Sequence, residues 1–205
     1  MKTKDKILLT AQKLFFTKGI DRTAIKEISE DAGINIAAVN YHFRSKENLI
    51  DLVFEKVISE FAPALPDILD SDKPIEIKLK EYISELNRLL LKFNPHLPFF
   101  IMSMMQRNPE RILELKIFTK LYNPELFYGQ LKEEAEKGHI NKVNPQHFFL
   151  TVLSLVGYPF SMQHILTGIN NWEEDGFEKF IKEREDMVYN ILIDILKGKN
   201  KDYIL

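Results

Sequence analysis

Apolar residues recur at helical spacing along the whole 205-residue chain, and this pattern limits the fold more than any other feature of the sequence. In the first segment Ile7, Ala11 and Leu14 share one side of a helix, with polar residues between them. No run shows the strict alternation, rich in β-branched residues, that a half-buried strand needs. The sequence therefore predicts an all-α protein.

Glycine, proline and asparagine residues divide this pattern into about nine helices. Gly19 is expected to end the first helix, Gly33 to form the turn after the second, and Ser45 to cap the fourth. The fourth helix is shared between two predicted domains, residues 1–50 and residues 51–205. The expected helices cover residues 3–18, 24–31, 36–41, 45–61, 74–93, 97–107, 110–137 with a break at Pro124, 145–168 and 173–197.

The composition excludes several classes of protein. The chain has no cysteine, so disulfide frameworks, thiolate chemistry and CxxC metal sites are ruled out. The apolar residues near the N-terminus are spaced as in an amphipathic helix and do not form a signal-peptide run. No stretch approaches the ~18 consecutive apolar residues of a membrane span. We expect a soluble cytoplasmic protein with no membrane partner.

Enzymes and metalloproteins are also disfavoured. None of the five histidines has another histidine or an acidic residue four positions away, so the spacing of a helical metal site is absent. There is no nucleophile elbow, phosphate-binding glycine loop or dinucleotide fingerprint. We expect no enzymatic activity, no metal and no cofactor.

Charge is distributed unevenly along the chain. The net charge is −2, but residues 1–50 hold nine Lys or Arg against six Asp or Glu, which gives +3, and the remaining residues carry −5. An asymmetry of this size is modest. It becomes informative only together with a motif that uses a positive surface.

Residues 21–49 carry such a motif, a helix-turn-helix. Short helices joined by a glycine turn allow the second helix to enter the major groove of DNA. Thr23 is expected to cap the first of them, and Ile34 and Val39 to face the interior of the module. The outward face of the second helix would then consist of Asn35, Ile36, Ala37, Ala38, Asn40 and Tyr41.

This region resembles the TetR family of bacterial transcription regulators. The resemblance rests on Thr23, Ile28, Ala32 and Gly33, and on the stretch from Val39 to Leu49, which reads VNYHFRSKENL. It covers about the first 50 residues. Behind them, only the length and the helical pattern agree with the family.

The resemblance implies roles for individual residues. Thr23, Tyr41, His42 and Lys46 would contact DNA phosphates, whereas Asn35, Ile36, Ala37, Asn40 and Tyr41 would face bases. Phe43 is interpreted as a structural plug between two helices. The alternative interpretation is a helical bundle in which Tyr41, His42 and Phe43 simply pack and Lys46 is solvated.

Residues 93–128 are rich in aromatic residues and methionine, for which two interpretations stand. They could fill an ordinary hydrophobic core, or they could surround a cavity for a small apolar or amphipathic ligand. In the second case the candidate pocket residues are Phe100, Met104, Gln106, Phe118, Tyr122 and His164.

The last two long helices carry a wide apolar stripe that could pack within the chain or against a second copy. The resemblance favours a homodimer built from a four-helix interface. Candidate interface residues are Val152, Val156, Phe180, Arg184, Val188, Ile191 and Ile195.

Two functional hypotheses follow. The first is a homodimeric repressor that binds a pseudo-palindromic double-stranded operator. An unknown small-molecule effector would release it by changing, through the fourth helix, the distance between the two DNA-binding domains of the dimer. The second is a helical ligand-binding or scaffolding protein without operator DNA. DNA binding with a steep salt dependence would separate them.

Overall fold

The computed structural model describes residues 2–61, 64–92, 97–114, 121 and 124–198. These residues form helices joined by turns and loops, and no strand occurs among them. The all-α prediction is thereby confirmed. The chain divides into two compact units. The first comprises residues 1–61 and 96–118, and the second residues 62–95 and 119–205. We refer to them as the reading unit and the regulatory unit, after the roles that the sequence predicts for them.

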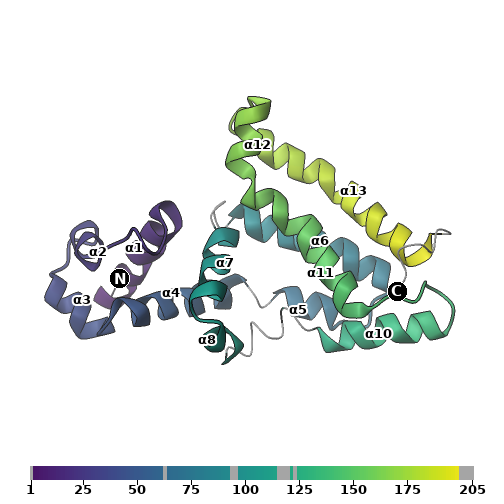
Figure 1. Cartoon of the computed structure of the whole chain (residues 1–205), viewed down its shortest axis with the longest axis horizontal. Coiled ribbons are helices and arrows are strands. Elements are labelled where there is room, and N and C mark those ends of the chain that lie inside the picture. Colours follow the sequence, from purple (N-terminus) through teal and green to yellow (C-terminus); the bar gives the residue numbers. More distant parts are fainter. Residues whose placement is uncertain (1, 62–63, 93–96, 115–120, 122–123, 199–205) are drawn as a thin grey trace. The chain divides into compact units, whose positions relative to one another are not determined.

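The reading unit begins with α1 (Thr3–Lys18), α2 (Ile25–Asp31), α3 (Ile36–Phe43) and α4 (Lys46–Phe61), which lie together in Figure 1. Gly19 follows α1 with a φ of 88°, a conformation that costs glycine little. The four helices meet through fully apolar side chains, as the periodicity predicted. This core includes Ile7, Ala11, Leu14, Phe15, Ile28, Val39, Phe43, Leu49 and Val53.

Two further helices complete the reading unit, α7 (Leu97–Arg107) and α8 (Pro109–Glu114). The Phe100 ring lies 5.0 Å from the Phe16 ring of α1 and 6.1 Å from the Phe54 ring of α4, measured between centroids. Ion pairs join Arg107 to Asp21 and Arg111 to Glu55. Helices α1 and α4 are therefore packed against residues far along the chain.

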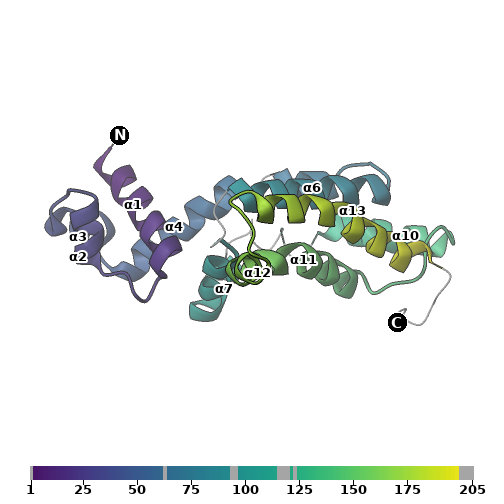
Figure 2. The ribbon, with the colours of Figure 1, turned by 90° about the horizontal axis from the view of Figure 1, so that it is seen from above.

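The regulatory unit is built from α5 (Ala64–Leu69), α6 (Ile75–Lys92), α10 (Glu125–Glu136), α11 (Pro145–Ser161), α12 (Gln163–Asn170) and α13 (Gly176–Lys197). Helices α6, α11 and α13 lie side by side in both views (Figures 1 and 2). Aromatic rings fill the space between helices, and Tyr82 and Phe127 both lie against Phe149. The unit has a conventional helical core.

Helix α5 was not expected, because Pro63 and Pro66 suggested a loop. Pro66 is the third residue of the helix, where no intrahelical acceptor exists for its missing N–H. A proline in the first turn therefore begins this helix instead of breaking it. Leu65 and Leu69 bury their side chains almost completely, and this packing stabilises a segment too short to be helical alone.

The predicted helix 145–168 is also wrong in one respect, since it is divided into α11 and α12, which bend by 59° at Met162. Pro159 lies inside α11 and has no N–H to donate to the Leu155 carbonyl, which accounts for the break. Arg184 of α13 donates from Nη2 to that carbonyl at 3.4 Å. The bend is thus supported from the neighbouring helix.

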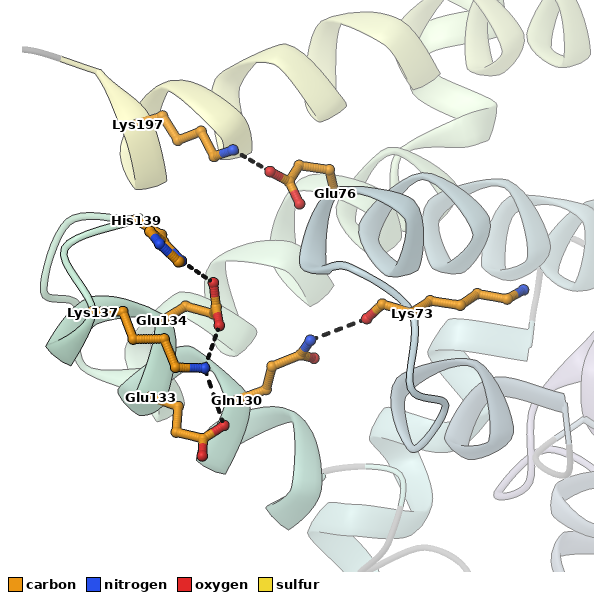
Figure 3. Close-up of polar contacts among 8 residues, drawn as sticks. All are labelled: Lys73, Glu76, Gln130, Glu133, Glu134, Lys137, His139 and Lys197. Atoms are coloured by element: carbon orange, nitrogen blue, oxygen red, sulfur yellow. Dashed lines mark hydrogen bonds and ion pairs between the residues drawn. The ribbon is translucent and has the colours of Figure 1, made fainter.

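Polar side chains join the elements at one end of the regulatory unit (Figure 3). Lys78, only 3% exposed, donates from Nζ to the Leu69 carbonyl at 2.8 Å and to Gln130 Oε1 at 2.7 Å. Gln130 in turn donates from Nε2 to the Lys73 carbonyl at 3.0 Å. Lys197 pairs with Glu76. Helices α5, α6, α10 and α13 are therefore tied together by specific hydrogen bonds and charge pairs.

Among the described residues, no single helix is both long and apolar enough to cross a membrane; only the bent pair α11 and α12, taken together, has the required length and composition.

Candidate nucleic-acid interface

The turn between α2 and α3 is formed by residues 32–35. Gly33 has a φ of 58°, and its N–H donates to the Glu30 carbonyl at 2.9 Å. The Ile34 N–H donates to the Ser29 carbonyl at the same distance, so both hydrogen bonds close the C-terminus of α2. Ala32 is 1% exposed and holds the turn against the core.

Helix α3 has one buried side and one free side. Val39 and Phe43, four residues apart, are 0% and 1% exposed, which confirms that Phe43 packs as a plug between helices. Asn35 precedes the helix, and its Oδ1 accepts from the Ala37 N–H at 2.8 Å. It therefore caps α3 as well as lying exposed at its start.

The outward side of α3 holds most of the residues predicted to face DNA. Ile36 is 43% and Tyr41 83% exposed, and Asn35, Ala37, Asn40 and His42 are exposed as well. The Asn40 side chain makes no hydrogen bond to any residue that the structure describes. A polar amide left free beside small side chains can reach a base edge.

Thr23 does not cap α2, so that prediction is wrong: the helix begins at Ile25, and Ala24 occupies the N-cap position without a side-chain hydrogen bond. Thr23 is 1% exposed, and its hydroxyl donates to the Gly19 carbonyl at 2.8 Å. It stabilises the connection between α1 and α2. Its predicted phosphate contact is not supported by this placement.

The start of α4 agrees with the sequence pattern. The Ser45 Oγ accepts from the Asn48 N–H at 3.1 Å, and Asn48 Nδ2 donates to the Phe43 carbonyl at 2.9 Å. These bonds fix the α3–α4 junction, and they confirm the predicted cap at Ser45. Lys46, the first residue of α4, is half-exposed and has no ion pair with a described residue.

A short helix that buries one side, presents a polar opposite side and follows a glycine turn defines a helix-turn-helix DNA-binding module. Residues 7–53 match the family described as bacterial regulatory proteins, tetR family. Residues 7–53 are therefore a DNA-binding module of the type found in TetR family transcriptional regulators.

Similar proteins support this assignment. The probable HTH-type transcriptional regulator YttP of Bacillus subtilis is 27% identical over 165 residues, 77% of each chain. The HTH-type transcriptional repressor BdcR of Escherichia coli is 31% identical over 84 residues, which is 41% of this chain and 43% of BdcR. The TetR family transcriptional regulator PfmR from Thermus thermophilus shares the fold over 98% of both chains, with a TM-score of 0.68 at 21% identity.

The predicted ligand-pocket residues are not gathered in one unit. Phe100, Met104 and Gln106 belong to the reading unit, where Phe100 and Met104 are buried and Gln106 is exposed. His164 belongs to the regulatory unit and is exposed. Phe118 and Tyr122 lie outside the described residues. The pocket stays a prediction.

Two surface hollows are formed by described residues of the regulatory unit, beside the connection between α10 and α11. Lys132, Glu136 and Asn144 line one of them, His139 and Lys197 line the other, and Lys142 lines both. None of the predicted ligand residues lines either hollow.

The predicted dimer residues fall into two groups. Val152, Val156 and Val188 are at most 3% exposed within the single chain, so they pack inside the regulatory unit. The others are partly accessible: Ile191 is 39% exposed, and Phe180, Arg184 and Ile195 are half-buried. Sequence reasoning missed the exposed apolar side chains of α11, of which Leu150 is 62% and Tyr158 65% exposed. Their eight-residue spacing, which places them on one helix face, was the available signal.

Proposed function

We propose that this protein is a homodimeric repressor that binds a pseudo-palindromic operator in double-stranded DNA, in the cytoplasm, and that a small apolar or amphipathic effector releases it. The outward face of α3 would enter the major groove, with Asn40 reading a base edge and Lys46 contacting a phosphate. Tyr41 and His42 would contact the DNA backbone beside it.

One observation carries the proposal more than any other: Asn40 and Tyr41 on the outer face of α3 are exposed, and the Asn40 amide has no hydrogen-bond partner among the described residues. Tyr41 is 83% exposed, although an aromatic side chain of a helical protein usually finds a place against its own fold. Asn40 and Lys46 likewise have no side-chain hydrogen bond or ion pair with any described residue. Exposed aromatic and amide groups on α3, together with a cationic group at the start of α4, match the mixture of base and phosphate contacts that DNA requires.

The test is a titration of the full chain against the DNA upstream of its own gene, at two salt concentrations. We expect binding tighter than to a scrambled fragment of the same length, and a steep loss of affinity as salt increases. Binding that is weak and independent of sequence and salt would instead support a helical ligand-binding or scaffolding protein.

Exposed apolar side chains on the last long helices support the dimer. Leu150 and Tyr158 of α11 and Met187 and Ile191 of α13 are each at least 39% exposed. A second copy that covers them would bury apolar surface worth ~25 cal/mol per Å². Contacts of this kind are self-complementary in a two-fold dimer, which would present two reading heads to a palindrome.

Ile191→Glu tests the dimer more cleanly than Val188→Glu, because Val188 is 2% exposed and its substitution would damage the fold itself. Sedimentation of the wild type is expected to show a dimer, and of Ile191→Glu a folded monomer. Lys182→Glu, an exposed change on the same helix, serves as the control and is expected to remain dimeric. A monomeric wild type would remove the dimer and the palindrome from the proposal.

The effector would act by shifting a population. A ligand that binds better to a dimer whose heads mismatch two successive major grooves lowers operator affinity by at most its preference for that state. The hollows beside α10 and α11 are lined by charged and polar residues together with apolar ones such as Val143, Pro145 and Leu196, so their linings do not by themselves identify the class of effector.

A further inference from the structure

The chain makes an unusual turn between α3 and α4. The Ser45 N–H donates to the Phe43 carbonyl at 2.7 Å, and the residue between them, Arg44, has φ 65° and ψ −46°. These values describe the positive-φ form of the γ-turn, which is rare and strained for a residue with a Cβ atom. Glycine would adopt the same conformation without that strain.

Contacts on both sides of Arg44 hold the turn in place. The Arg44 N–H donates to the Asn40 carbonyl at 2.8 Å, which closes the last turn of α3. Asn48 Nδ2 holds the Phe43 carbonyl at 2.9 Å, and Phe43 itself is 1% exposed. The backbone of the junction is therefore determined by its surroundings, the condition under which strained residues persist.

The Arg44 side chain makes no contact that would stabilise the described part of the chain. It is exposed, and its guanidinium forms no hydrogen bond or ion pair with any residue that the structure describes. Glu47, the nearest acidic residue in sequence, does not pair with it. A strained backbone position occupied by an arginine whose side chain makes no described contact suggests a role outside the fold.

We propose that Arg44 is a DNA-phosphate anchor, and that the strained turn sets the backbone position from which its guanidinium reaches a phosphate beside α3. This inference rests on the proposed operator binding. Arg44 lies between His42 and Lys46 in sequence, so three groups able to donate to phosphate oxygens occur within five residues at one end of α3. A guanidinium can bind a phosphate through two parallel N–H groups and thereby sets the orientation of the helix on the duplex.

The deciding variant is Arg44→Gly, because it should raise the stability of the protein and lower its affinity for DNA. Removing the Cβ atom relieves the turn, so the melting temperature should rise by about 2–4 °C. Losing one phosphate contact should weaken operator binding about five- to tenfold at ~0.1 M salt and lower the salt slope by about one unit. Arg44→Lys should keep the slope and lose part of the affinity.

Lys13→Ala is the matched control, since Lys13 is an exposed cation on α1 outside the helix-turn-helix; it should leave affinity and slope unchanged. If the wild type shows no operator binding, both the proposed function and this inference are contradicted. If the wild type binds and Arg44→Gly keeps its affinity and slope, only the anchor is overturned. Weaker binding with an unchanged slope also overturns it, because the turn geometry and not the charge would then be responsible.

Discussion

The reading unit and the regulatory unit use polar side chains in opposite ways. On the outer face of the reading unit, Asn40, Arg44 and Lys46 have no side-chain partner among the described residues. In the regulatory unit, Lys78 and Gln130 are bonded to backbone carbonyls of other elements, and Arg184 supports the bend of α11. The difference separates groups that are available to another molecule, as the proposed function requires, from groups that stabilise the fold. Substitutions should therefore alter DNA binding in the first set and stability in the second.

Lys78→Ala should give the largest change of stability. It leaves the Leu69 carbonyl and Gln130 Oε1 without their donor and removes a buried aliphatic stem, so the free energy of unfolding should fall by about 2–4 kcal/mol. Denaturant unfolding measures it, with the exposed Lys132→Ala of α10 as the control. A loss no larger than the control's would mean that the regulatory unit does not depend on its buried polar groups.

The same variant predicts a pH dependence. Burial lowers the pKa of the Lys78 ammonium, against the opposite effect of Asp70 and Asp72. Between that lowered pKa and ~10.4, the value for an unfolded chain, the unfolded state binds more protons, so stability rises with pH. The difference in unfolding free energy between wild type and Lys78→Ala should therefore increase as the pH is raised toward ~10. If the difference in unfolding free energy stays constant or decreases as the pH is raised, the lowered pKa of Lys78 is contradicted.

A smaller effect is expected at the bend of α11. Pro159→Ala supplies the N–H that the Leu155 carbonyl lacks, so that carbonyl no longer needs the hydrogen bond from Arg184. Arg184→Met should cost about 0.5–1.5 kcal/mol less in the Pro159→Ala background than in the wild type. A double-mutant cycle by denaturant unfolding gives this coupling. Additive effects would show that Arg184 acts independently of the proline.

The smallest change of stability is expected for Lys46→Ala, in the reading unit. The half-exposed Lys46 side chain has no ion pair with a described residue, so its removal should leave unfolding unchanged. Operator and non-operator DNA should both bind more weakly by about the same factor, and the salt slope should fall by about one unit. An unaltered slope would remove Lys46 from the interface.

Sequence patterns predicted the first four helices of the reading unit well because their signals are local, whereas residues 96–118 were expected in the other domain. Gly19, Gly33 and Ser45 stand where a positive φ or a cap is needed, and the apolar spacing on α3 separates Val39 from its exposed neighbours. The roles of these residues depend on chain segments only a few positions away. The exception is Thr23, whose hydroxyl bonds the preceding connection and does not cap α2.

The regulatory unit was predicted less completely, because its decisive contacts join distant residues. Nothing near Lys78 in sequence indicates that Gln130, 52 positions away, accepts its hydrogen bond. Helix α5 depends on packing that local propensity does not reveal, and α11 was expected to continue through Pro159 and Met162. The dimer prediction combined side chains that the fold buries, such as Val152, with accessible ones, such as Ile191.

The central claim is that the free outer face of α3 reads operator bases, and Asn40 tests it most directly. Wild type and Asn40→Ala should be measured against every single base-pair change in the operator. We predict that the variant loses ~1–3 kcal/mol on the preferred sequence and stops discriminating at one base pair in each half-site, as loss of a bidentate contact to adenine requires. If Asn40→Ala weakens binding to all operator variants by the same factor and every position keeps its discrimination, the claim is contradicted for this residue.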